Sequence, residues 1–103
     1  MRLVRVAKDG RTLWLAAVVG EDLYTYVPNT AKFHLNSGLR DDFVMARELQ
    51  YDEIGLAEAR QLLDGGVPSL DEDVMADPLR EWRADPDPLD PETVFAAVSA
   101  DLA

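Results

Sequence analysis

The alternation of apolar and polar residues at the start of the chain predicts a β-hairpin over residues 2–19. Two alternating segments, 3–7 and 12–19, flank Asp9-Gly10. An Asp-Gly pair favours a two-residue loop, because both positions of that loop require positive φ. We therefore expect Asp9-Gly10 to connect two antiparallel strands.

The register of this hairpin predicts which side chains share a face of the sheet. A two-residue loop pairs Val6 with Leu13 and Val4 with Leu15, and it places Arg5 opposite Trp14 on the second face. A guanidinium over an exposed indole is favourable by about 0.5–1 kcal/mol. The first face is apolar throughout and is the expected core side: Val4, Val6, Leu13, Leu15, Ala17 and Val19.

A third strand is predicted at 23–27, after a turn at 20–22, and Pro28 ends it because proline has no N–H for the ladder. Two lengths of the preceding loop remain open. A two-residue loop places Tyr24 and Tyr26 on the core face beside Ala17. A three-residue loop places both rings on the Arg5 and Trp14 face.

Helical spacing follows the third strand. Asn29 and Thr30 can cap a helix, and Ser37-Gly38 interrupts it, so a helix that begins at Ser37 is the alternative. The pattern depends on three residues at i, i+4 and i+8: Leu35, Leu39 and Phe43. In the longer helix, His34 and Asp41 would share a face.

The middle of the chain predicts one more strand and one more helix. Residues 49–54 alternate like a fourth strand, although a helix there is a real alternative. Residues 56–63 have the composition of a helix, and Gly65-Gly66 ends it.

Three short helices are predicted in the last third of the chain. The segment 69–72 has the Ser-x-x-Glu pattern of a capping box, and Asp77-Pro78 and Asp90-Pro91 each resemble an N-cap followed by proline. Residues 85–91 are an acidic linker spaced by prolines, which favours an extended, semi-rigid chain. The expected helices cover 70–76, 78–84 and 91–102.

These elements predict an α+β fold in which a small antiparallel sheet of three to four strands packs with several short helices. The chain of 103 residues has room for one domain, and its 48% apolar content is ordinary for a globular protein. We expect residues 1–66 to form the α+β core and residues 67–103 an acidic helical arm of the same domain. The two open sheet edges predict either a homodimer or edges capped by the C-terminal helices.

Charge is concentrated in the second half of the chain. The net charge is −10, and residues 52–103 carry three arginines and fourteen carboxylates, so 3 − 14 = −11. Such a surface repels nucleic acids and anionic lipids and attracts basic proteins. We therefore expect a protein partner with a basic surface or self-association, and neither a nucleic acid nor a membrane. The chain has no cysteine, which fits a cytoplasmic location.

The sequence has no motif that fixes a chemistry. Phosphate-binding loops, zinc-protease motifs and calcium loops are missing, and the single histidine, His34, has no visible nucleophile beside it. We expect no catalytic residues, no bound metal and no cofactor. A small ligand- or metal-binding module that uses Tyr24, Tyr26 and His34 is the alternative function, and an enzyme ranks third.

The sequence favours a non-enzymatic interaction or regulatory protein, antitoxin-like or immunity-like, that binds through its acidic half. The last predicted helix has an apolar face, and Trp82 stands alone in an acidic segment. This arm could fold back on its own sheet, exchange with a second copy or lie in a partner's groove. The predicted partner-binding residues are Trp82, Asp85, Asp87, Val94, Phe95, Val98 and Leu102.

Overall fold

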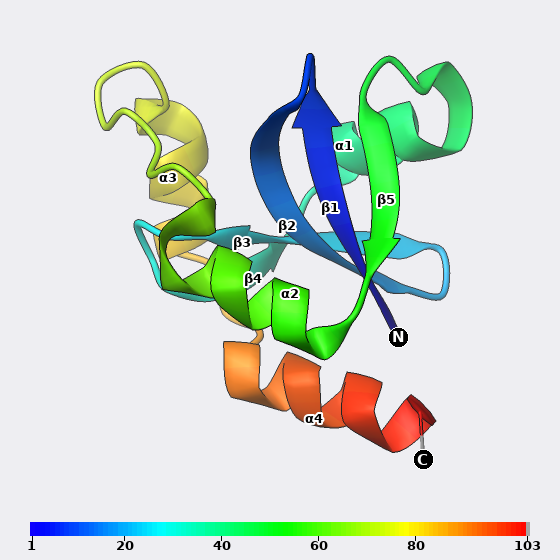
Figure 1. The fold of residues 1–103 in the computed structure, drawn as a ribbon. Helices are drawn as coiled ribbons and strands as arrows, with labels where there is room; N and C mark the ends of the chain where they lie inside the picture. The colour runs from blue at the N-terminus through cyan, green and yellow to red at the C-terminus, as the bar shows by residue number, and fades with distance from the viewer. Residues whose placement is uncertain (103) are drawn as a thin grey trace.

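Five strands and four α-helices follow one another in the computed structural model, which describes residues 1–102 without the side chain of Leu102 (Figure 1). The strands are β1 (Arg2–Lys8), β2 (Arg11–Val19), β3 (Asp22–Val27), β4 (Lys32–Leu35) and β5 (Gln50–Ile54). The α-helices are α1 (Ser37–Asp41), α2 (Leu56–Gln61), α3 (Ala76–Arg83) and α4 (Pro91–Leu102), with π-helical segments η1 (Asp42–Ala46) and η2 (Leu62–Gly66). The predicted α+β class is confirmed, with one strand more than the three or four expected.

The strands form one antiparallel sheet in the order β4-β3-β2-β1-β5, and helices cover both of its faces (Figure 1). On the first face, α2 and α4 pack over a core that includes Leu3, Leu15 and Phe33. On the second face, α1 and η1 pack over a core that includes Val4 and Val6. Because both faces are buried, β1 and β2 need apolar residues on both sides.

The turn of the N-terminal hairpin is confirmed, but its register is wrong by one residue. Lys8 pairs with Arg11 across the two-residue loop, in which Asp9 and Gly10 have φ of 52° and 78°. Farther along, Val6 pairs with Trp14 and Ala7 with Thr12. Leu13 is therefore an extra residue, which makes a β-bulge and moves the rest of β2 by one position.

This bulge changes which side chains share a face. Val4 pairs with Ala16 and Arg5 with Leu15, so Leu15 and Ala17 lie on the face opposite Val4. The predicted single core face is therefore wrong, and so is the predicted contact of Arg5 with Trp14. Instead, the Nε of Arg5 donates to Oγ1 of Thr12 at 2.6 Å.

Replacing Gly10 by valine should lower the free energy of unfolding by about 1–2 kcal/mol, because a β-branched residue resists positive φ. Urea unfolding measures the change. Gly38→Ala is the matched control, since Gly38 lies in α1 at negative φ with its nearest neighbour 3.8 Å from an added Cβ. An unchanged stability of Gly10→Val would contradict this turn conformation.

The loop between β2 and β3 has two residues. Val19 pairs with Asp22, and Ala17 pairs with Tyr24. This is the shorter of the two lengths left open by the sequence, and it places Tyr24 and Tyr26 on the Ala17 face, where Tyr26 packs into the first core.

The helix predicted to begin at Asn29 or Thr30 is wrong, because the chain makes a tight turn there and returns as β4. The N–H groups of Thr30 and Ala31 both donate to the carbonyl of Val27, and Ala31 has φ of 58°. Phe33 then pairs with Tyr26. The apparent helical spacing misleads because Leu35, its first member, is 45% exposed.

The alternative start of the helix at Ser37 is confirmed. The side chain of Asn36 accepts a hydrogen bond from the N–H of Leu39 at 3.0 Å, which is an ordinary N-cap. His34 therefore lies on a strand and Asp41 on a helix, so they do not share a helix face.

The predictions for the middle of the chain are confirmed. Residues Gln50–Ile54 form β5, which pairs with β1, and Leu56–Gln61 form α2. The helical segment ends in η2, where Gly65 has φ of 115°.

The last third contains two of the three predicted helices. Pro91–Leu102 form α4 as predicted, and α3 covers Ala76–Arg83 rather than 78–84. Residues 70–75 form no helix; the Asp71 carboxylate accepts the N–H groups of Asp73 and Val74, and its carbonyl accepts that of Met75, which makes a single turn before α3.

The proline-spaced segment 85–91 lies against the edge of the sheet and is not a free tether. Leu89 exchanges both backbone hydrogen bonds with Phe33 of β4, at 2.8 and 2.9 Å. The expectation that helices cap the sheet edges is therefore wrong at β4, where this segment does so. Within residues 1–102, β5 pairs with no strand other than β1.

Candidate functional site

The only histidine forms the centre of a buried polar network. His34 lies on β4 and is 1% exposed. Its Nδ1 lies 2.9 Å from Oδ2 of Asp85, and its Nε2 lies 2.7 Å from Oγ1 of Thr30. The network therefore joins the β3–β4 turn, β4 and the segment after α3.

The two ring nitrogens of His34 face partners of different chemistry. An ionised Asp85 can only accept, so Nδ1 of His34 carries a proton. The Thr30 hydroxyl lies beside Nε2 and also donates to the carbonyl of Val27 at 3.2 Å. The hydrogen bond from His34, aided by the backbone N–H of Asp87, holds the pKa of Asp85 below its usual value.

A hydroxyl, an imidazole and a carboxylate in this order also form nucleophilic catalytic triads. Here the imidazole is 1% exposed, and Thr30 is partly exposed. Trp82 of α3 stacks on His34, with ring centroids 6.1 Å apart, and Trp14 contacts Trp82 edge-on at 6.0 Å. A buried and fully hydrogen-bonded imidazole under an indole favours a clasp that fixes the C-terminal region on the sheet.

The structure divides the predicted partner-binding residues between the first core, the His34 network and the surface. Val94, Phe95 and Val98 of α4 are 0%, 2% and 6% exposed in the first core. The arm thus folds back on its own sheet, one of the three arrangements left open by the sequence. In this conformation these three side chains have no surface for a partner, because the first face of the sheet needs a cover.

The other predicted partner-binding residues have mixed positions. Trp82 and Asp85 belong to the His34 network, and Asp87 is exposed. The side chain of Leu102 lies outside the described part of the chain. Of the predicted set, Asp87 keeps an open side chain for a partner.

The alternative site around Tyr24, Tyr26 and His34 is not an open pocket. Tyr26 is 8% exposed, and its ring packs 5.5 Å from that of Phe33. Burial, with the nearby charge of Asp64, raises the pKa of Tyr26. Among the described residues, no group of three or more His, Asp or Glu side chains could hold a metal ion.

An acidic loop, residues 71–75, stands out from the surface between η2 and α3, at the upper left of Figure 1. It contains Asp71, Glu72 and Asp73, all exposed, followed by Val74, whose residue surface is 78% exposed. Between Arg60 and Arg80 the sequence has five acidic residues and no basic one. The loop therefore places three neighbouring carboxylates at the surface, of which Glu72 is paired with Arg83.

The base of the acidic loop is fixed to the β3–β4 turn. The side chain of Asn29 accepts from the N–H of Leu70 at 2.8 Å and donates to its carbonyl at 3.0 Å. Asn29 also donates to Glu72, which Arg83 contacts at 2.8 Å. The hydrogen bonds from Arg83 and Asn29 lower the pKa of Glu72 to about 2.

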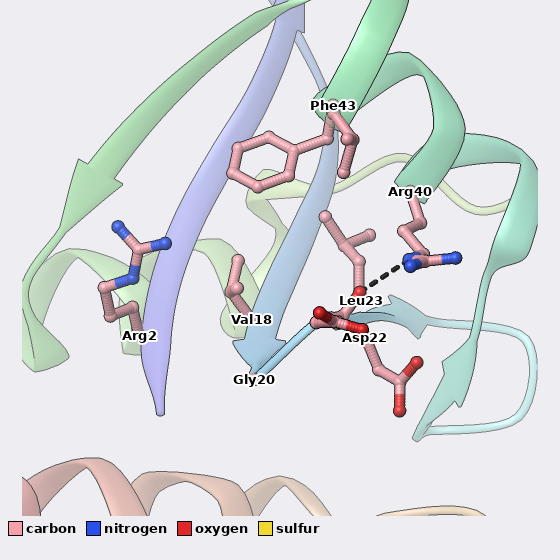
Figure 2. Close-up of a pocket in the computed structure, with 9 residues that line it drawn as sticks. Arg2, Val18, Gly20, Asp22, Leu23, Arg40 and Phe43 are labelled. Carbon is pink, nitrogen blue, oxygen red and sulfur yellow. Dashed lines mark hydrogen bonds between the residues drawn. The ribbon is translucent and has the colours of Figure 1, made fainter.

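A cavity of about 280 Å³ lies at the opposite end of the sheet, where the start of β1, the β2–β3 turn and α1–η1 meet (Figure 2). The guanidinium groups of Arg2 and Arg40 lie on opposite sides of its apolar side chains (Figure 2). The cavity is lined by Arg2, Val18, Gly20, Glu21, Asp22, Leu23, Arg40, Phe43 and Val44. Sequence reasoning missed this site, since Arg2 and Arg40 meet only through the sheet order and the position of α1.

Comparison with known proteins found no matching family model, no similar curated protein and no similar solved structure. Through residue 102, no helix has both the length and the apolar character needed to cross a membrane.

Proposed function

We propose that this protein is a non-enzymatic interaction protein that binds a basic protein partner through the acidic loop. One observation carries the proposal: Val74 is 78% exposed directly beside three exposed carboxylates. Single exposed apolar side chains are common on protein surfaces, and it is the position of Val74 among carboxylates that gives a basic partner both an apolar and a charged contact.

The composition of the loop resembles a small binding epitope. Val74 supplies an apolar contact, and Asp71, Glu72 and Asp73 supply a charged rim around it. Interfaces commonly combine an apolar centre with a polar rim, and the rim charges determine association rate and specificity. The excess of carboxylates in the C-terminal half adds a long-range attraction for a basic surface.

The loop is also pre-ordered for binding. The Asp71 carboxylate fixes the turn by accepting from Asp73 and Val74, and Asn29 holds the base through Leu70. A rigid epitope loses less conformational entropy when it binds, so it retains more affinity for a given contact area.

Two variants test the proposal. Asp71→Asn/Asp73→Asn removes two charges and keeps an oxygen at Asp71 for the turn, and Val74→Ser removes the apolar contact without changing charge. Asp52→Asn/Glu53→Gln is the matched control, because it removes two exposed charges from β5. Each protein is immobilised and used to capture partners from a cell lysate at low and high salt.

A basic partner should bind wild type and control equally and weaken at high salt. The loop variants should bind it about tenfold more weakly, the loss typical of removing a central interface contact. If the loop variants retain every partner of the wild type, the proposed function is wrong. Loss of a wild-type oligomer in the loop variants, measured by sedimentation, would identify the partner as a second copy.

A further inference from the structure

The cavity at the β2–β3 turn has an apolar floor between two arginines. Its floor consists of Val18, Leu23, Phe43 and Val44. The guanidinium groups of Arg2 and Arg40 lie on opposite sides of these side chains (Figure 2). This arrangement suits a ligand with an apolar centre and negative charge on either side of it, rather than a single charged group that meets both arginines.

Both arginines can bind a further partner. The Nε of Arg40 donates to the carbonyl oxygen of Glu21 at 2.6 Å, which fixes the guanidinium over the β2–β3 turn. In the part of the chain that the structure describes, Arg40 takes part in no salt bridge, so its Nη groups remain to donate to a carboxylate. Arg2 has an ion pair with Glu53 at 4.0 Å, and such exposed pairs are weak.

The floor of the cavity continues onto the surface of η1. Val44, which lines the cavity, is 62% exposed, and the adjacent Met45 is 82% exposed. Arg47 lies over the ring of Phe43, 4.5 Å from its centroid, and fixes this floor residue from the side. Neighbouring exposed apolar residues beside a cavity indicate a surface for interaction rather than a scattered exposed side chain.

The acidic loop, residues 71–75, has the complementary chemistry. Val74 is 78% exposed, and the Asp71 carboxylate accepts the N–H groups of Asp73 and Val74, so the turn holds carboxylates beside the valine. Among the described residues, neither Asp71 nor Asp73 takes part in a salt bridge, whereas Glu72 is bound to Arg83. The loop therefore presents an apolar side chain with free carboxylates next to it.

We propose that the cavity receives the acidic loop of a second copy of this protein. Val74 of one copy packs on the apolar floor of the other, and the carboxylates beside it meet the guanidinium groups that flank the floor. The cavity volume of about 280 Å³ lies just below the usual range of small-molecule pockets and suits an inserted side chain. This inference rests on the proposed function, because it uses the same loop and names the basic surface that the loop binds.

The contact joins two molecules. The loop stands between η2 and α3, and the cavity lies at the opposite end of the sheet, so a folded chain does not place its own loop in its own cavity (Figure 1). The two surfaces differ, and the contact is therefore heterologous. Each copy offers one loop and one cavity, so successive contacts either close into a ring of two or more copies or continue as an open chain.

Two sources of negative charge oppose the contact. The net charge of −10 makes two copies repel each other, but the Debye length of about 8 Å at about 0.15 M salt limits this repulsion to nearby groups. Among the residues that line the cavity, Asp22 alternates with Leu23 along β3 and lies toward the other face of the sheet. Glu21 is then the lining carboxylate that the loop meets. Glu21→Gln should therefore strengthen the association, a gain that damage to the fold does not produce.

Sedimentation velocity of the pure protein over a range of concentrations, at about 0.15 M salt, tests the inference. The wild type should associate. Val74→Ser, Arg40→Gln and Val44→Ser should each weaken the association about tenfold, the loss typical of a central interface contact. Arg11→Gln, which changes an exposed arginine beside the other hairpin turn, is the control and should associate as the wild type does.

A mixture of two weakened proteins tests whether the loop meets the cavity. Val74→Ser keeps the cavity intact, and the double variant Arg40→Gln/Val44→Ser keeps the loop intact. Each alone should sediment as a monomer at concentrations where the wild type associates, whereas an equimolar mixture should form a complex of two chains. Unlabelled double variant should also shift the NMR signals of Gly20 and Leu23 in ¹⁵N-labelled Val74→Ser.

The inference fails if the wild type stays monomeric at millimolar concentration, if the cavity variants associate as the wild type does, or if the mixture forms no complex. In each of these cases, a basic partner that is captured by the wild type and lost by the loop variants leaves the proposed function standing. If the loop variants keep the association of the wild type and every captured partner, both proposals are wrong.

Discussion

Replacing Phe95 by alanine should lower the free energy of unfolding by about 3–5 kcal/mol. Phe95 is 2% exposed and packs in the first core with Leu3 and Phe33. The guanidinium of Arg60 also lies 4.9 Å from the centre of its ring. Removal of the ring leaves a cavity in the first core, through which α4 packs on the sheet. Such a loss is a large part of the stability of a domain, which is about 5–15 kcal/mol in total.

Urea unfolding of Phe95→Ala and of Ser99→Ala measures this effect. Ser99 is exposed on the same helix, so its replacement changes α4 without changing the core and should alter stability by less than about 0.5 kcal/mol. Equal stability of the two variants would mean that α4 leaves the sheet in solution. The arm would then again be a candidate for exchange with a second copy or for binding in a partner's groove.

Replacing Asp85 by alanine should lower the free energy of unfolding by about 1–3 kcal/mol, because Nδ1–H of the buried His34 then has no acceptor. Asp87→Ala is the control, since Asp87 is exposed two residues away. Because the indole of Trp82 stacks on His34, the Trp82 fluorescence of folded Asp85→Ala should also differ from that of the wild type. Equal stability of the two variants would contradict the clasp.

The contribution of Asp85 should also depend on pH. Its pKa is lowered in the folded state, so its stabilising effect is present above the unfolded value of about 3.9 and is lost as pH falls through the folded value. The difference in stability between wild type and Asp85→Asn should therefore be constant above about pH 5 and shrink as the pH falls below it. A difference that stays constant below this pH as well would show that the Asp85 carboxylate is not the interacting form.

Local signals in the sequence predicted much of the fold. Asp9-Gly10 specified its turn because positive φ is a local requirement, and Asp90-Pro91 marked the start of α4. The bulge at Leu13 could not be predicted, since it arises where two buried faces must both be filled. The four-residue strand β4 was hidden because the chain around it also fits helical spacing.

The candidate sites were harder to predict because they depend on contacts between distant residues. His34 and Asp85 are 51 positions apart, and their pairing appears only when segment 85–91 lies along β4. The apolar face of α4 was visible in the sequence, but a pattern of this kind does not say whether its partner belongs to the same chain. The isolation of Trp82 likewise indicated an anchor without indicating that His34 is its contact.

The segment that borders β4 has a consequence for aggregation. Pro86, Pro88 and Pro91 have no N–H, so this border offers few donors to an additional strand. Leu89 already uses its N–H and carbonyl on Phe33. At the other edge, β5 carries Asp52 and Glu53, whose charges oppose the approach of an identical edge. The sheet therefore has one border with few donors for a further strand and one that repels its own copy, and both should slow the formation of fibrils by the folded protein at high concentration.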